Sequence, residues 1–212
     1  MKKTTVIFDW NGTLIDDVDL CLNLLNTMLV KRNLQPLSVE RYREIFTFPV
    51  IEYYKKAGID VENESFDDLA VEFMDPYVEQ YRTCSLVSHC KEVLTCLKEK
   101  GLRCVVLSAT KQDYLEEQVS AFGIEEFFDE LVGIQDIKAA GKIERAKQWM
   151  STQGIDKEEC IMVGDSIHDS EVAAELGIDC LLSTTGHQNR ERLAACGRII
   201  IDDLMQIFDH IG

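Results

Sequence analysis

Basic residues are scarce in this sequence. It has 22 lysines and arginines against 38 aspartates and glutamates, so its net charge at pH 7 is -16 over 212 residues. An acidic surface repels the phosphate backbone of nucleic acids. We therefore expect no nucleic-acid partner.

Long apolar runs are also missing. No stretch approaches the ~20 apolar residues that a membrane-spanning helix needs. Near the start of the chain, the apolar run Val6–Phe8 stops at Asp9, and it is too short for a signal peptide. We expect no membrane partner and predict a cytoplasmic protein, either a monomer or a homodimer.

Metal-binding and disulfide patterns are absent from the eight cysteines. They form no Cys-x-x-Cys pair, and no histidine lies near them at the spacing of zinc ligands. Several fall inside apolar runs, such as Cys104 in LRCVVL and Cys180 in IDCLL. This pattern predicts buried free thiols.

Short apolar runs alternate with helical patterns from about residue 87 onward. Runs of this length predict strands buried on both faces, and several of the helical segments end at a glycine. The predicted strands are 4–9, 102–108, 127–133, 159–165, 178–184 and 198–201; the predicted helices are 89–101, 111–123, 142–154, 170–177, 189–197 and 202–210. The alternation predicts an α/β fold, with a Rossmann-like parallel sheet and helices on both faces.

Residues 15–85 have a different pattern, because every segment with a clear preference favours helix. These segments are 20–32, 38–46, 50–58 and 66–83, and we see no convincing strand among them. We therefore predict a helical domain, 15–85, inserted into a core domain formed by 1–14 and 86–212. Asp16 or Asp17 is expected to cap its first helix.

Polar residues follow three of the predicted strands. In an open parallel sheet, ligands bind beyond the carboxyl ends of the strands, so these residues are candidates for one site. They are Asp9 and Asn11 at the end of the strand 4–9, Ser108 at the end of 102–108, and Asp165 and Asp169 at the end of 159–165, with the small residues Gly12 and Ala109 beside them.

The residue types indicate phosphate chemistry with a magnesium ion. Clustered carboxylates such as Asp9, Asp165 and Asp169 take up protons unless a cation offsets them, and all-oxygen ligands suit Mg²⁺. Ser108 and the first amides of the next helix suit an anion. A lysine is then expected against the phosphate charge.

Several of these residues allow a second interpretation. Lys142 is the best placed lysine, and Lys138 is the alternative. Asp169 could instead cap the helix that follows it. His168 and His187 are expected to be surface or turn residues.

The ordered motifs FDWNGTL, VVLSAT, GKIERAK and VGDSIHD resemble those of the haloacid dehalogenase superfamily of phosphohydrolases, over nearly the whole chain. The resemblance implies that Asp9 is the nucleophile. It also implies that Asp9, the backbone carbonyl of Asn11 and Asp165 hold Mg²⁺, and that Asp169 holds Lys142 or a metal-bound water. The implied phosphate-binding residues are Asn11, Gly12, Ser108, Ala109 and Lys142.

The helical insertion resembles the C1 cap of the phosphoglycolate phosphatase and β-phosphoglucomutase branch. Such a cap would close over the site and select a small phosphorylated metabolite. The segment 45–54 (IFTFPVIEYY) is our candidate for its substrate-facing part, although a role in the core of the cap is equally compatible with its aromatic residues.

Asn11 departs from the family pattern, since the phosphatases usually carry an aspartate there as general acid and base. An amide can donate a hydrogen bond but cannot exchange that proton. Three hypotheses follow. The first is a phosphatase that is slow on alkyl phosphates, or adequate on substrates whose leaving group needs no proton. The second is a phosphonoacetaldehyde hydrolase, in which Lys55 or Lys56 forms a Schiff base, and the third is a protein that only binds a phosphorylated ligand or a partner. We favour the first, an enzyme that is a Mg²⁺-dependent phosphatase.

Overall fold

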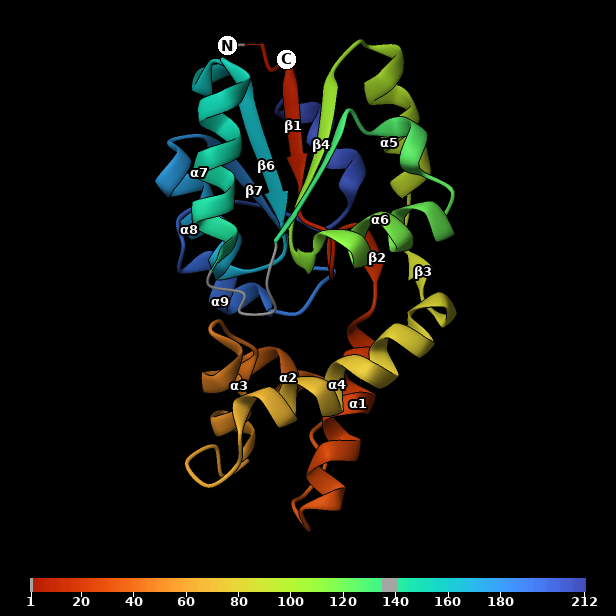
Figure 1. Ribbon diagram of the computed structural model, residues 1–212. Coiled ribbons are helices and arrows are strands. Elements are labelled where there is room, and N and C mark those ends of the chain that lie inside the picture. The colour runs from red at the N-terminus through yellow and green to blue at the C-terminus, as the bar shows by residue number, and fades with distance from the viewer. Residues whose placement is uncertain (1, 135–140) are drawn as a thin grey trace.

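The protein is built on one parallel sheet with a group of helices at one end of it. A computed structural model describes residues 2–134 and 141–212. The sheet has six strands in the order β5-β4-β1-β6-β7-β8, and every neighbouring pair is parallel. In Figure 1 the arrows of β1 and β6 point toward helices α1–α4. The carboxyl ends of the strands therefore face those helices.

The elements follow the alternation expected from the sequence. The strands are β1 (Thr5–Phe8), β2 (Ile15–Asp16), β3 (Ser85–Leu86), β4 (Arg103–Lys111), β5 (Glu130–Ile134), β6 (Cys160–Gly164), β7 (Asp179–Ser183) and β8 (Ile199–Ile201). The α-helices are α1 (Val18–Lys31), α2 (Val39–Ile45), α3 (Val50–Ala57), α4 (Phe66–Gln80), α5 (Cys90–Glu99), α6 (Gln112–Ala121), α7 (Lys142–Gln153), α8 (Ile167–Leu176) and α9 (Arg190–Ala194). Short 3₁₀ helices cover Tyr81–Thr83, Glu125–Phe127, Lys157–Glu159 and Leu204–Asp209. The predicted α/β class, a Rossmann-like sheet with helices on both faces, is confirmed.

The central strand β1 is buried along its whole length, and its last three residues are apolar, because both of its faces are covered. Val6 and Phe8 pack into one hydrophobic cluster with α5 and α6, and Ile7 packs into another with α7 and α8. This alternation follows from the two-residue repeat of a strand. Burial on both faces explains why the strand reads as a continuous apolar run.

The helices α1–α4 (residues 18–80) form a separate group within the helical insertion predicted over 15–85. Its buried side chains make a third hydrophobic cluster, which includes Leu25, Leu29 and Tyr42. Two short strands connect it to the sheet, with Ile15 paired to Leu86 and Asp16 to Ser85. The separate cluster supports the division into a core domain and a helical domain, which stays a prediction.

Three details differ from the sequence-based expectations. The range 15–85 contains a strand after all, because β2 and part of β3 lie in it and pair as an antiparallel ribbon. The strand expected over 102–108 continues to Lys111, with an irregular register after Leu107. The last helix is 3₁₀ rather than α, starting at Leu204 after a capping box at Asp203.

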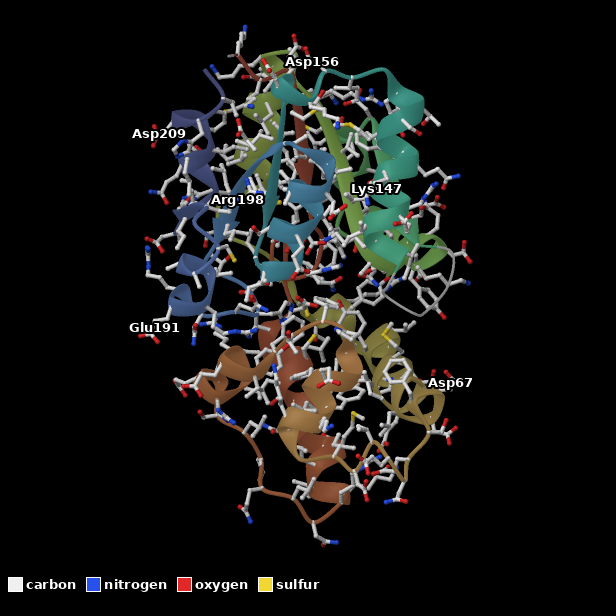
Figure 2. All side chains as sticks on the ribbon, turned by 90° about the vertical axis from the view of Figure 1, so that its left-hand side faces the viewer. Asp67, Lys147, Asp156, Glu191, Arg198 and Asp209 are labelled. Atoms are coloured by element: carbon white, nitrogen blue, oxygen red, sulfur yellow. The ribbon has the colours of Figure 1, made fainter. Side chains whose placement is uncertain are left out.

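The cysteines are free and mostly buried, as expected, and charged side chains lie on the surface. All eight cysteines are free thiols within the described residues, and five of them are buried. Charged side chains such as Lys147, Glu191 and Asp209 point outward in Figure 2. Among the helices that the structure describes, none has the length and apolar character needed to cross a bilayer.

The packing of α1 gives a test of the third cluster. Leu25 is fully buried there, whereas Val30 on the same helix is 58 % exposed. We expect Leu25→Ala to lower the free energy of unfolding by about 2–5 kcal/mol, because it leaves a cavity. Val30→Ala, the matched control, should change it by less than about 0.5 kcal/mol. Urea unfolding followed by circular dichroism measures both, and equal effects would contradict the packing described here.

Candidate active site

Three buried carboxylates meet beyond the carboxyl ends of β1 and β6. Asp9 directly follows β1, Asp165 directly follows β6, and Asp169 lies in the first turn of α8. Each offers a carboxylate oxygen, and these oxygens all lie within 4.8 Å of one another. The three aspartates that the sequence indicated are therefore brought together.

Lys142, the first residue of α7, lies between two of these carboxylates. Its Nζ is 2.6 Å from Asp9 Oδ1 and 2.6 Å from Asp169 Oδ1, and the lysine is buried. Although burial disfavours the charged form, both carboxylates raise the pKa of Lys142, so it stays protonated. The lysine predicted for this position is in contact with the acids, whereas Lys138 lies outside the described residues.

The negative charge of the three carboxylates exceeds the single positive charge of Lys142. Burial raises the pKa of Asp9 to about 7, because neighbouring carboxylates add to desolvation and outweigh the attraction of Lys142. Burial likewise raises the pKa of Asp165 to about 6. Three carboxylates beside one ammonium leave two negative charges, which a divalent cation with oxygen ligands would balance. The donor set therefore fits Mg²⁺.

Asp169 fulfils both of the roles considered for it. Its Oδ1 accepts from Lys142, while its Oδ2 accepts from the backbone N and the Oγ of Ser166, which completes a capping box at the start of α8. Despite burial, the pKa of Asp169 is lowered, since Lys142 and Ser166 stabilise the carboxylate. With both oxygens engaged, Asp169 is placed to hold the lysine.

Two glycines allow the carboxylate of Asp165 to lie close to the backbone. A Cβ added to Gly12 would lie 2.4 Å from Asp165 Oδ2, and one added to Gly186 would lie 2.1 Å from the same atom. Gly12 also has a φ of +72°, which other residues rarely adopt. Gly186 was not among the sequence-based candidates.

Ser108 and Ala109 lie within β4 rather than after it. Phe8 pairs with Val106, so Ser108 is two residues beyond the last paired residue of β1, level with the turn that follows Asp9. Ser108 is buried, and its Oγ accepts from the backbone N of Thr110 at 3.0 Å. The next helix begins only at Gln112. Their contact with phosphate stays a prediction.

The side chain of Asn11 is held on both sides. Its Nδ2 donates to Asp17 Oδ2 at 2.8 Å and to Tyr77 Oη at 2.7 Å, and its Oδ1 accepts from Thr110 Oγ1 at 2.9 Å. Tyr77 belongs to the helical insertion, whereas Thr110 belongs to β4. The amide therefore joins the insertion to the sheet through hydrogen bonds that a carboxylate at position 11 could not make in the same way.

Asp17 has a different role from the cap expected of it. It occupies the N-cap position of α1, but its side chain makes no capping hydrogen bond there. Its carboxylate instead accepts from Asn11, from the backbone N of Gly12 and from Tyr77. Its pKa is lowered, since these donors and His187 outweigh the effect of burial.

His187 lies in the turn region after β7, one of the two positions expected for it, but it is buried rather than at the surface. Its Nε2 is 3.2 Å from Asp17 Oδ1, its Nδ1 is 2.7 Å from Tyr42 Oη, and its backbone N donates to Asp165 Oδ2 at 2.6 Å. Burial opposes protonation, but Asp17 raises the pKa of His187 to about 9. A search for candidate residues beyond the carboxyl end of every predicted strand would have found His187, because it lies four positions beyond the end of β7.

The remaining sequence candidates lie around this centre. His168 is partly buried, with its ring 5.0 Å from that of Phe48. Phe46 stacks on His187 at 4.7 Å, so part of the segment 45–54 faces the sheet domain. Lys55 and Lys56 are exposed on α3, as expected of a solvated helix face. Neither Lys55 nor Lys56 is thereby indicated as a Schiff-base lysine.

Comparison with known proteins places this chain in a family. The model of the haloacid dehalogenase-like hydrolases matches residues 6–183. The chain is 27 % identical over 184 residues to a pyrophosphatase, PpaX, of Halalkalibacterium halodurans, covering 80 % of this chain and 78 % of that one. It is 24 % identical over 209 residues to a phosphoglycolate phosphatase of Pseudomonas putida, covering 94 % and 76 %.

A solved structure shares the fold over its whole length. It is that of Protein Tyrosine Kinase A of Mycobacterium tuberculosis, with a TM-score of 0.82, 21 % identity and coverage of 100 % of this chain and 99 % of that one. At this identity the likeness shows the fold alone, and one fold can carry several reactions. The family match over most of the chain goes further: the protein belongs to the haloacid dehalogenase-like hydrolases.

Proposed function

We propose that this protein is a Mg²⁺-dependent phosphatase that acts on a small phosphorylated metabolite through an aspartyl-phosphate intermediate. The observation that carries this proposal is the buried group of Asp9, Asp165 and Asp169 around the ammonium of Lys142. The names of two relatives, a pyrophosphatase and a phosphoglycolate phosphatase, support the reaction class.

Asp9 is the residue that we infer attacks phosphorus. It ends the central strand, and its Oδ1 is fixed by Lys142 at 2.6 Å, which leaves the other oxygen available to a substrate. A covalent phosphoryl-aspartate divides the transfer into two easier steps. Lys142 then offsets the charge that spreads over the phosphoryl oxygens, together with Ser108 and the backbone amides of residues 11 and 109. The backbone amide of Gly12, also expected to bind phosphate, already donates to Asp17 Oδ1 and would have to exchange that partner for the phosphoryl group.

The residues that would hold Mg²⁺ are Asp9, Asp165 and the backbone carbonyl of Asn11, with Asp169 acting through Lys142 or a water. A bound Mg²⁺ would offset the carboxylate charge and orient a phosphate oxygen. The helical insertion would act as a cap that excludes water and selects the substrate, with the segment 45–54 as its substrate-facing part.

Asn11 restricts which substrates turn over well. Without a carboxyl group at this position, the leaving oxygen receives no proton from it, and such help is worth roughly 10²–10⁴-fold. That corresponds to about 3–5 kcal/mol of barrier. We infer a preference for substrates whose leaving group needs no proton, such as aryl phosphates or phosphoric anhydrides.

Turnover by Asp9 tests the proposed function. With Mg²⁺ and an aryl phosphate, inorganic pyrophosphate and a panel of alkyl phosphates, we expect the wild type to hydrolyse at least the aryl phosphate. Asp9→Asn should abolish turnover and the hydroxylamine-sensitive phosphoryl label, while Asp209→Asn, an exposed acid far from the site, should leave both unchanged. Binding of phosphate without turnover on any substrate would instead indicate a binding protein.

The pair formed by Asn11 and Asp17 generates a sharper test. Asn11→Asp alone places two carboxylates in contact, because Asn11 Nδ2 is 2.8 Å from Asp17 Oδ2, and one of them must take up a proton. The exchange Asn11→Asp with Asp17→Asn restores one acid beside one amide. We expect the double variant to raise kcat on alkyl phosphates by up to about 10²-fold, and the single variant by less.

Two controls accompany this exchange. Asp17→Asn alone should give no gain, and the rate on an aryl phosphate should stay nearly constant in the double variant. An unchanged ratio of alkyl to aryl rates in the double variant would show that position 11 does not limit protonation of the leaving group.

The raised pKa values of Asp9 and Asp165 predict how Mg²⁺ affinity changes with pH. In the metal-free protein these pKa values are about 7 and about 6, so protons compete with the cation below neutral pH. We expect the affinity measured by calorimetry to be nearly constant above pH 8 and to fall at least about tenfold by pH 5.5. A flat profile would contradict the role of these carboxylates as ligands.

A further inference from the structure

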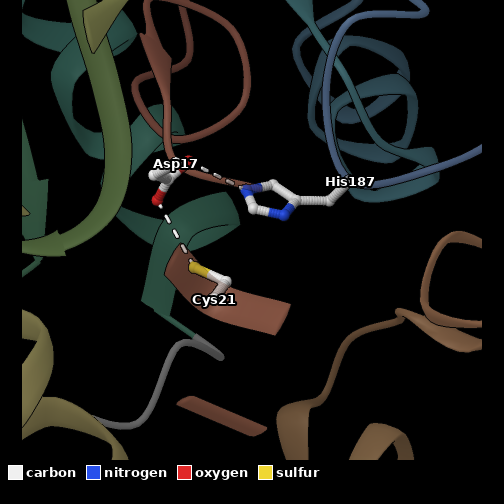
Figure 3. Close-up of side chains that lie close together, drawn as sticks. All are labelled: Asp17, Cys21 and His187. Carbon is white, nitrogen blue, oxygen red and sulfur yellow. Dashed lines mark hydrogen bonds and ion pairs between the residues drawn. The ribbon is translucent and has the colours of Figure 1, made fainter. Parts of the chain in front are cut away.

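A second group of ligand-type side chains lies beside the carboxylate centre, and it contains sulfur and nitrogen as well as oxygen. Asp17, Cys21 and His187 are all buried, and one ligand atom of each lies within 4.8 Å of the others. Cys21 Sγ is 3.5 Å from Asp17 Oδ2, and His187 Nε2 is 3.2 Å from Asp17 Oδ1 (Figure 3). The function proposed above assigns no catalytic or metal-binding role to these three side chains.

The chain brings this group together from two distant segments. Asp17 and Cys21 are four residues apart at the start of α1, a spacing that puts both on one face of the helix. His187 comes from the loop after β7, so it approaches from the sheet. In Figure 3 dashed lines join the Asp17 carboxylate to His187 and to Cys21, so that the three side chains form a triangle.

The imidazole has the second partner that metal-bound histidines usually have. Tyr42 Oη lies 2.7 Å from Nδ1, on the far side of the ring from Asp17, and Tyr42 is fully buried. A hydrogen bond at Nδ1 fixes the ring so that Nε2 faces Asp17 and Cys21. Outer partners of this kind orient histidine ligands and strengthen metal binding.

We propose that Asp17, Cys21 and His187 form a second cation site, one that takes a borderline-soft divalent ion of the Zn²⁺ class rather than Mg²⁺. Thiolate and imidazole ligands select such ions, whereas Mg²⁺ prefers oxygen. Tetrahedral bonds of the lengths found for zinc separate ligand atoms by about 3.3–3.6 Å. Cys21 Sγ and His187 Nε2 each lie at a similar distance from one oxygen of Asp17, which is Oδ2 for the thiol and Oδ1 for the imidazole. A water or a substrate oxygen would complete the fourth position.

The charges agree with this assignment. A carboxylate and a thiolate together balance a divalent ion, while His187 would bind as the neutral imidazole. Without a cation, burial and the nearby carboxylate raise the pKa of the Cys21 thiol well above its usual range, so the thiol donates to Asp17. Binding therefore releases the thiol proton, and any proton on Nε2 of His187, to solvent.

An ion at this position would tie the helical insertion to the sheet. Two ligands lie at the start of α1 and the third follows β7. The ion would therefore bind residues from both parts of the molecule, which must separate if the helical insertion moves away from the sheet. It would also engage Asp17, which holds the side chain of Asn11. We expect Zn²⁺ to slow turnover at concentrations that leave Mg²⁺ in the carboxylate centre.

Cobalt spectroscopy tests the site without relying on activity. With excess Mg²⁺ present, Co²⁺ should bind one equivalent and give a near-ultraviolet thiolate-to-cobalt charge-transfer band, which Zn²⁺ removes. Cys21→Ala should abolish the band, whereas Cys90→Ala, a buried thiol outside the group, should keep it. Tyr42→Phe should weaken the affinity for Co²⁺ by about 10–100-fold while the band remains.

The outcomes separate this site from the carboxylate centre. A band that persists in Cys21→Ala, or Co²⁺ binding with no thiolate band, would overturn the proposal. Circular dichroism and urea unfolding of each variant show whether it is folded, and Cys21→Ser gives a second variant of nearly equal size. The charge-transfer band reports on the second cation site, whereas turnover reports on the proposed phosphatase function. Failure of one proposal can therefore be distinguished from failure of the other.

Discussion

The ammonium of Lys142, held between Asp9 and Asp169, is the interaction on which the rest of this structure depends. Removing a charge from water is costly, and a buried ion pair is tolerated only where its partners satisfy one another closely. Here one lysine joins the end of β1 to the start of α8 and lies at the first residue of α7. These three elements are thereby fixed at one edge of the sheet, and that edge is the site.

One positive charge does not neutralise three buried carboxylates, and this imbalance gives the site its chemistry. The raised pKa values of Asp9 and Asp165 express it, because each acid would be stabilised either by a proton or by a cation. Asp169, whose pKa is lowered, is already satisfied by Lys142 and Ser166. The three acids that look equivalent in the sequence therefore divide into one whose pKa is lowered and two, Asp9 and Asp165, whose pKa values are raised despite their contacts with Lys142 and the backbone of His187.

Asn11 forms the link between this centre and the helical insertion. Its amide accepts from Thr110 of β4 and donates to Asp17 and to Tyr77 of α4. An acid at position 11 would face the carboxylate of Asp17, so the amide at one position and the acid at the other form a matched pair. The unusual residue in the first motif is thus explained locally by its neighbour six residues later.

The sequence by itself determined the α/β class, the family and the grouping of Asp9, Asp165, Asp169 and Lys142. It could do so because strand periodicity is local, and because parallel strands place their carboxyl ends at one edge. Only the tertiary structure decided the partners of Asn11 and the burial of His187, which lies 170 residues from Asp17 in the chain. Contacts of that separation depend on how the insertion packs against the sheet, and no periodicity along the chain encodes that packing.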